Sequence, residues 1–221
     1  MIPIVVLVVA KAPVPGHAKT RLAASVGDQA AADIAAAALL DTLDAVAAAD
    51  VQARMVALTG DLDGASAGDE IRSSLADFTV LMQRGAHFAE RLANAHVDAA
   101  EAAGGLPVLQ IGMDTPQVTG ELIGECAREL LAADVVLGLA RDGGWWVLGV
   151  TDPVMADCLR TVPMSRPDTG AVTLSALHDT GLHVSLVPTL ADVDHVDDID
   201  AVRRACPPGG RFARVTLAVG V

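Results

Sequence analysis

The run IPIVVLVVA, residues 2–10, is unbroken, apolar and rich in β-branched side chains. A strand with one face in water alternates polar and apolar residues, whereas an unbroken run is typical of a strand covered on both faces in a parallel sheet. The run is too short to cross a bilayer and no basic leader precedes it, so it predicts a buried strand rather than a signal peptide or membrane span. A loop broken by proline and glycine follows directly, in the stretch KAPVPGHAKTRL, residues 11–22.

Strand and helix patterns alternate through the rest of the chain. Helices are predicted at residues 28–50, 87–104, from about 119 for a dozen residues, 169–181 and 196–205, and further strands at 53–59, 78–83, 106–112, 135–140, 145–150 and 183–189. This alternation predicts an α/β fold, a three-layer α/β/α sandwich around a mixed, mostly parallel sheet, with residues 1–221 as one domain. Residues 60–69 are expected to form a loop, and the tail RFARVTLAVGV, residues 211–221, an added edge strand.

Composition excludes several classes of protein. A net charge of −13 and a pI near 4.6 repel phosphate backbones, so a nucleic-acid partner is not expected, although one local basic pocket can hold a small anion. Cys126, Cys158 and Cys206 are odd in number and widely spaced, which fits neither a disulfide framework nor a zinc site and predicts free thiols in a reducing cytoplasm. The chain has no HExxH or GxSxG motif, which argues against zinc and serine hydrolases.

The loop after the first strand contains both lysines of the chain. Ligands of open α/β sheets gather at the carboxyl ends of strands, and phosphate recognition needs glycine-exposed backbone N–H groups, lysines and a forked arginine. The spacing matches neither the P-loop nor GxGxxG, and a solvated basic loop is the alternative. The candidate ligand-binding residues in this loop are Lys11, Gly16, Lys19, Thr20 and Arg21.

Two further turns contain carboxylates. Asp114 follows a predicted strand, where it can hold a divalent cation or cap the next helix. Asp192 and Asp194 alternate at strand spacing, so they can share a face, where a metal or a cation would have to compensate their repulsion. A solvated acidic helix start is the alternative for the segment DVDHVDD, residues 192–198.

The turn RDGG, residues 141–144, connects two apolar runs and precedes both tryptophans of the chain. Its glycines permit close approach of a ligand, and Asp142 could bind a sugar hydroxyl or act as a general base. A simple tight turn before core tryptophans is the alternative. The weaker candidates, in and before the second long helix, are Gln83, Arg84, Glu90 and Arg91. Of these, Glu90 and Arg91 are interpreted as surface residues.

The motifs AKAPVPGHAKTRL, HFAERLANA, IGMDTPQVT, VVLGLARDGGWWVLGV and LADVDHVDDID together resemble a bacterial family of predicted glycosyltransferases within the nucleotide-diphospho-sugar transferase superfamily, over about residues 4–203. The resemblance implies a GT-A type fold and a cytoplasmic enzyme. By position it implies that Lys11, Lys19 and Arg21 face the nucleotide phosphates and that Asp114 holds Mg²⁺ or Mn²⁺, completed by Asp192 or Asp194. It also places Asp142, Gly143, Gly144 and Trp145 beside the donor sugar or acceptor.

The chain departs from that family on the sugar side. Leu139 and Arg141 stand where the family usually has a proline and an acidic residue, and Met164 stands where a tryptophan is expected. The resemblance implies metal-dependent glycosyl transfer from a nucleoside diphosphate sugar to a small acceptor, with Asp142 and Asp114 as catalytic residues. Two alternatives stay open. One is nucleotidyl transfer from a nucleoside triphosphate to a phosphorylated small molecule, which the missing LxxGxGxRM-type loop weakens, and the other is a non-catalytic nucleotide-binding domain.

Overall fold

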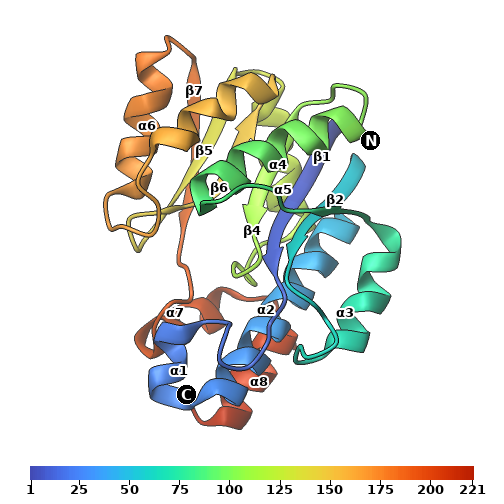
Figure 1. Cartoon of the computed structure of the whole chain (residues 1–221), viewed down its shortest axis with the longest axis vertical. Coiled ribbons are helices and arrows are strands. Elements are labelled where there is room, and N and C mark those ends of the chain that lie inside the picture. Colours follow the sequence, from blue (N-terminus) through green and yellow to red (C-terminus); the bar gives the residue numbers. More distant parts are fainter.

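In the computed structural model, which describes residues 1–221, a seven-stranded sheet runs through the centre of the molecule with strand order β3-β2-β1-β4-β6-β5-β7 (Figure 1). Only β6 runs antiparallel to its neighbours. The strands are β1 (Ile2–Lys11), β2 (Val51–Thr59), β3 (Thr79–Met82), β4 (Val108–Gly112), β5 (Val135–Ala140), β6 (Trp145–Val150) and β7 (Val184–Leu190).

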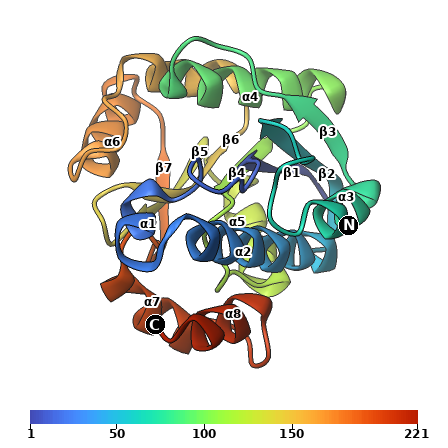
Figure 2. The ribbon, with the colours of Figure 1, turned by 60° about the horizontal axis from the view of Figure 1, so that its bottom comes forward.

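Helices cover both faces of this sheet. They are α1 (Thr20–Val26), α2 (Asp28–Ala48), α3 (Gly68–Ser74), α4 (Phe88–Ala102), α5 (Gly120–Leu130), α6 (Thr169–Asp179), α7 (Val196–Ala205) and α8 (Arg211–Val219), with the 3₁₀ helices η1 (Leu75–Asp77) and η2 (Pro153–Thr161). Figure 2 shows α4 and α6 on one side of the sheet, α2 and α5 on the other, and α7 and α8 outside α2. The predicted three-layer α/β/α sandwich is therefore confirmed. None of its helices is both long and apolar enough to span a bilayer.

The unbroken apolar run of β1 is explained by the two layers of helices. Ile4, Val6 and Val8 pack in the core that contains α2 and α5, whereas Val5 and Leu7 pack in the core that contains α4 and η2. All five side chains are fully buried. Because successive side chains of a strand point to opposite faces, every side chain of a central strand between two helical layers points into a core, and none of them faces water.

The prediction of an edge strand for the tail is wrong, since the tail forms α8. Phe212 and Val215 lie at helical spacing and pack against α2, where Phe212 joins Ile34 in a separate core cluster. The carboxylate of Asp41 in α2 accepts hydrogen bonds from the backbone N–H groups of Arg211 and Phe212, both at 2.9 Å, and so caps the start of α8. The Asp41 carboxylate that caps α8 belongs to α2 and lies 170 positions before Arg211 in the chain.

Other expected elements are close to those observed. The helix predicted from about residue 119 is α5, which Thr119 caps because its hydroxyl accepts a hydrogen bond from the Leu122 N–H. The short helices α1 and α3 were not predicted, and α3 begins at Gly68, within the expected loop. The three cysteines are free thiols, as the spacing predicted.

Candidate active site

The four turns singled out from the sequence meet at one edge of the sheet. The strands β1, β4, β5 and β7 run in the same direction, so their carboxyl ends lie along one edge, and the antiparallel β6 starts there. A cavity of about 720 Å³ opens at this edge. Of the predicted site residues, the cavity is lined by Lys11, Arg21, Asp114, Asp142, Gly144, Trp145, Asp192 and Asp194, but not by Gly16, Lys19, Thr20 or Gly143.

Lys19 is a buried cation among the carboxylates. Its Nζ donates hydrogen bonds to Asp114 Oδ2 at 2.5 Å and Asp194 Oδ1 at 3.2 Å, and lies 3.8 Å from Asp192 Oδ1. Burial by itself lowers the pKa of Lys19, but the three carboxylates outweigh it and raise that pKa above its ordinary value. The ammonium therefore stays charged, and it joins the loop after β1 to the turns after β4 and β7.

The two aspartates after β7 differ in their electrostatics. Burial, reinforced by the charge of Asp114, raises the pKa of Asp192 to about 7 in spite of the nearby Lys19. Burial also acts on Asp194, but Lys19 and Arg21 outweigh it and lower the pKa of Asp194. Arg21 Nη1 donates to Asp194 Oδ2 at 2.6 Å. Asp194 is thus held as an anion by two cations.

Three carboxylates are placed so that they could hold one metal ion. Asp142, Asp192 and Asp194 each offer a carboxylate oxygen, and these oxygens lie within 4.8 Å of one another. The sequence led us to expect the set Asp114, Asp192 and Asp194, whereas the structure brings Asp142 into this group and places Asp114 next to it, bonded to Lys19. Carboxylate oxygens are the protein ligands that Mg²⁺ and Mn²⁺ favour.

The RDGG turn is fixed in position by its glycines. Gly143 has a φ of +92°, and a Cβ at that position would lie 1.8 Å from the Pro167 carbonyl oxygen. The carbonyl of Gly143 accepts a hydrogen bond of 2.7 Å from Gly170 N–H, and Asp142 Oδ1 accepts one of 2.8 Å from Gly144 N–H. The segment of residues 163–170 approaches the turn so closely that position 143 requires glycine. Asp142 is consequently held at the cavity by backbone contacts on both sides.

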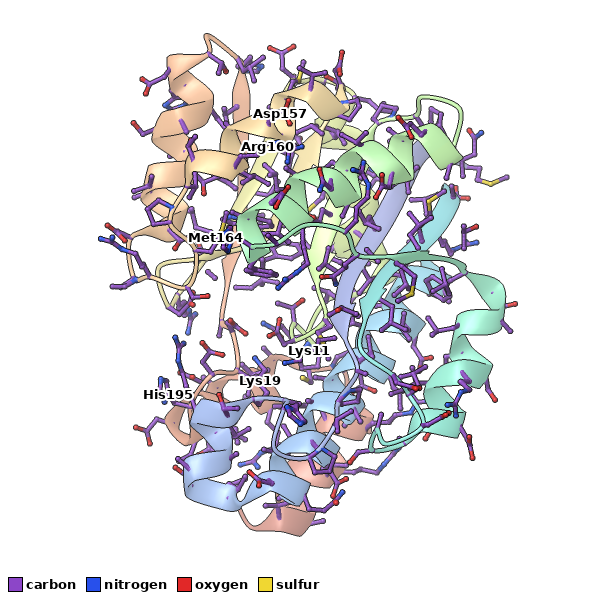
Figure 3. All side chains as sticks on the ribbon, in the orientation of Figure 1. Lys11, Lys19, Asp157, Arg160, Met164 and His195 are labelled. Atoms are coloured by element: carbon purple, nitrogen blue, oxygen red, sulfur yellow. The ribbon has the colours of Figure 1, made fainter.

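The two tryptophans have different roles in the structure. Trp145 lines the cavity, whereas Trp146 is buried in the core and its Nε1 donates to the Pro188 carbonyl at 2.9 Å. On the basic side, the Nζ of Lys11 donates to the His17 carbonyl at 2.8 Å. Figure 3 shows Lys11, Lys19 and His195 on one side of this region and Met164 on the other.

Sequence reasoning missed part of the cavity wall. Arg91, interpreted from the sequence as a surface residue, lines the cavity together with Phe88, and Gln110 of β4 lines it as well. A signal for Gln110 was available, because it is the one polar side chain in the apolar run LPVLQIG, residues 106–112. A polar side chain in a buried strand requires a partner or a ligand.

His96 of α4 is fully buried behind this wall, and its Nε2 lies 3.3 Å from Gln110 Nε2. Burial lowers the pKa of His96 to about 3. The unfolded chain binds a proton at His96 below about pH 6.5 and the folded chain does not, so folding is disfavoured as pH falls.

As the pH falls from 6.5 to 5.0, we expect the free energy of unfolding of wild type to decrease by about 2 kcal/mol more than that of His96→Gln. Urea denaturation of both proteins at several pH values measures this difference. Asp192 acts in the opposite direction in both proteins, so only their difference reports on His96. Parallel stability profiles would contradict a neutral, buried His96.

The chain belongs to a family described as an uncharacterized protein conserved in bacteria (DUF2064), whose model matches residues 42–166, more than half of the chain. No curated protein matches it in a sequence search. Among solved structures, it is similar to a protein from Desulfovibrio desulfuricans G20 with the provisional description of nucleotide-diphospho-sugar transferase. The two are 25% identical with a TM-score of 0.84, over 99% of this chain and 97% of that one. The fold is therefore that of the nucleotide-diphospho-sugar transferases, as the sequence motifs suggested.

Two more distant structures share the fold. Rv0371c from Mycobacterium tuberculosis H37Rv, in complex with manganese, is 18% identical with a TM-score of 0.51, over 90% of this chain and 97% of that one. CMP:2-keto-3-deoxy-manno-octonic acid synthetase in complex with CTP is 11% identical with a TM-score of 0.55, over 90% of this chain and 96% of that one. At these identities the similarity concerns the fold alone.

Proposed function

We propose that this protein is a metal-dependent glycosyltransferase that transfers a sugar from a nucleoside diphosphate to a small acceptor. The observation that carries the proposal is the cluster at the carboxyl edge of the sheet, where Asp142, Asp192 and Asp194 converge beside the cations Lys19 and Arg21. The cluster faces a cavity large enough for a nucleotide sugar. The description of the protein that is 25% identical supports the same chemistry.

The three converging carboxylates fit a divalent cation. Their oxygens lie within 4.8 Å of one another, and the group is all oxygen, which suits Mg²⁺ or Mn²⁺. When bound, such a cation supplies positive charge that stabilises the departing diphosphate. The manganese in the Rv0371c structure agrees with this choice of metal.

The protein's own groups supply the remaining parts of the chemistry. Lys11 and Arg21 line the cavity on the side of the β1 loop, where their N–H groups can bind the phosphates of the donor. Lys19 neutralises part of the charge of the carboxylates, so that an anionic nucleotide can approach them. If Asp192 and Asp194 hold the cation, Asp142, exposed at the cavity, orients the acceptor hydroxyl or takes its proton; if Asp142 completes the metal site, Asp114 is the candidate for this role.

Nucleotidyl transfer is the second candidate function. It is favoured by the several cytidylyl- and nucleotidyltransferases among the structures that share this fold, one of them solved with CTP. In that reaction the same carboxylates and cations would bind a nucleoside triphosphate, and an acidic acceptor would attack its α-phosphate.

Thermal unfolding with a panel of nucleotide sugars and nucleoside triphosphates, each with and without Mg²⁺ or Mn²⁺, distinguishes the candidates. A ligand at about 100 times its dissociation constant stabilises a protein by about 2.7 kcal/mol. We expect stabilisation by one nucleotide sugar in the presence of metal, followed by release of its nucleoside diphosphate when acceptors are added. Stabilisation by a triphosphate alone would favour nucleotidyl transfer, and binding that never leads to turnover would favour a non-catalytic domain.

A further inference from the structure

Arg91 is a partly buried arginine whose guanidinium has no anionic partner within the chain. Its side chain forms no salt bridge and no hydrogen bond, and its Nε is buried without an acceptor. The other arginines whose side chains form no hydrogen bond or salt bridge are exposed to water, namely Arg128, Arg141 and Arg204. A buried N–H donor without an acceptor is unfavourable, and the rest of the guanidinium lies in the cavity wall, where a group from outside the chain can reach it.

The other cations of the cavity wall are already engaged. Arg21 is paired with Asp194, and Arg166 is paired with Asp168. Lys11 donates to a backbone carbonyl. Among the lysines and arginines of this wall, Arg91 is therefore the one whose side chain makes no hydrogen bond or ion pair within the chain.

The wall around Arg91 is apolar and aromatic. The guanidinium carbon of Arg91 lies 5.7 Å from the centre of the Phe88 ring, and Leu92, Trp145 and Met164 line the same cavity. The chain has only three phenylalanines, two tryptophans and no tyrosine, and two of these few aromatic side chains, Phe88 and Trp145, line this one cavity. Such a wall binds an apolar or planar part of a ligand.

Gln110 gives an independent indication of a ligand at this wall. Its side chain is 1% exposed and lines the cavity, and its Oε1 has no partner. Since its Nε2 is placed next to His96, turning the amide over would leave the nitrogen without a partner instead. In either orientation one buried polar group of Gln110, directly behind the cavity surface, lacks a partner within the chain.

We propose that Arg91 binds the anionic group of the acceptor, so that the acceptor is a small molecule carrying a phosphate ester or a carboxylate next to an apolar or planar portion. This inference rests on the proposed function, which places the donor phosphates at the β1 loop and leaves the α4 side for the acceptor. The guanidinium fork of Arg91 matches both a phosphate and a carboxylate. Phe88 and Trp145 contact the attached portion.

The test uses the whole protein and measures binding by calorimetry without metal or nucleotide. The probes are phenyl phosphate, benzoate and, as the neutral counterpart, benzyl alcohol. We expect one of the two anions to bind more tightly than benzyl alcohol, and Arg91→Gln to weaken that binding about tenfold or more, because charge-assisted hydrogen bonds are lost. Arg72→Gln makes the same change of charge at a surface ion pair and should leave binding unchanged.

Each outcome bears on the inference. Tighter binding of phenyl phosphate assigns a phosphate ester, and tighter binding of benzoate a carboxylate. Arg91→Lys keeps the charge without the fork and should retain part of the affinity, which also serves if Arg91→Gln does not fold. Equal binding by wild type and the Arg91 variants, or no preference over benzyl alcohol, would overturn the inference.

The proposed function is tested separately in the same variants. Binding of Mn²⁺ to Arg91→Gln should match wild type, since Arg91 is not one of the converging carboxylates or their bonded cations. Loss of anion binding with retained Mn²⁺ binding would support both proposals. Retained anion binding in Arg91→Gln with normal Mn²⁺ binding would reject only the acceptor site, and failure of wild type to bind Mn²⁺ would reject only the metal-dependent function.

Discussion

Replacing Asp194 by alanine is expected to lower the affinity for Mn²⁺ by more than about 100-fold, because residues that merely support metal ligands already contribute 10–100-fold. Asp194 belongs to the three carboxylates whose oxygens converge, and Lys19 and Arg21 hold it as an anion. Calorimetric titration with Mn²⁺ measures the effect directly. Metal-dependent nucleotide binding should be lost in the same variant.

The matched control is Asp197→Ala, which removes an exposed carboxylate three positions further along the same segment. Its Mn²⁺ affinity should equal that of wild type. Circular dichroism of both variants reports whether the fold is intact. Unchanged Mn²⁺ binding by a folded Asp194→Ala protein would reject the assignment of the metal to this group.

Lys19→Met should reduce the free energy of unfolding by about 3 kcal/mol in the absence of metal. The substitution keeps a side chain of similar length but removes the cation, which leaves the partly buried Asp114 and Asp192 unpaired and Asp194 paired with Arg21 alone. Urea denaturation measures the loss. Mn²⁺ at about 100 times its dissociation constant should restore about 2.7 kcal/mol, since a bound cation compensates the same carboxylates.

Lys11→Met serves as the comparison. Lys11 lies in the same loop, but it is exposed and bonded only to a carbonyl, so we expect a change within about 0.5 kcal/mol. A loss below about 1 kcal/mol for Lys19→Met would mean that Lys19 contributes little to holding the carboxylates together.

The fold could be predicted from local patterns because most elements show their own periodicity. The run at residues 2–10 predicted a central strand, and the alternation of strands and helices predicted the layers. The tail could not be assigned in this way, because α8 depends on Asp41 and on the surface of α2, which lie far away in the sequence. Local propensity has no access to such tertiary partners.

The location of the candidate site also followed from the sequence, but the pairing of its residues did not. The carboxyl-end rule selected the four turns that line the cavity. It could not tell that Lys19 contacts carboxylates, or that Asp142 also converges with Asp192 and Asp194 while Asp114 is bonded to Lys19. These are properties of side-chain positions across strands that are not neighbours in the chain. Arg91 was interpreted as a surface residue for the same reason, since helical spacing alone does not show which neighbours cover a helix.

The ion pairs of Lys19 connect residues that are 95 and 175 positions apart. The candidate site is therefore complete only when the first loop, the turn after β4 and the segment after β7 have all been placed, which makes its assembly a late event in folding. Local opening of the first loop would remove Lys19 and so disconnect the other two segments from each other. Amide hydrogen exchange in the three segments should therefore slow together when a cation or nucleotide binds.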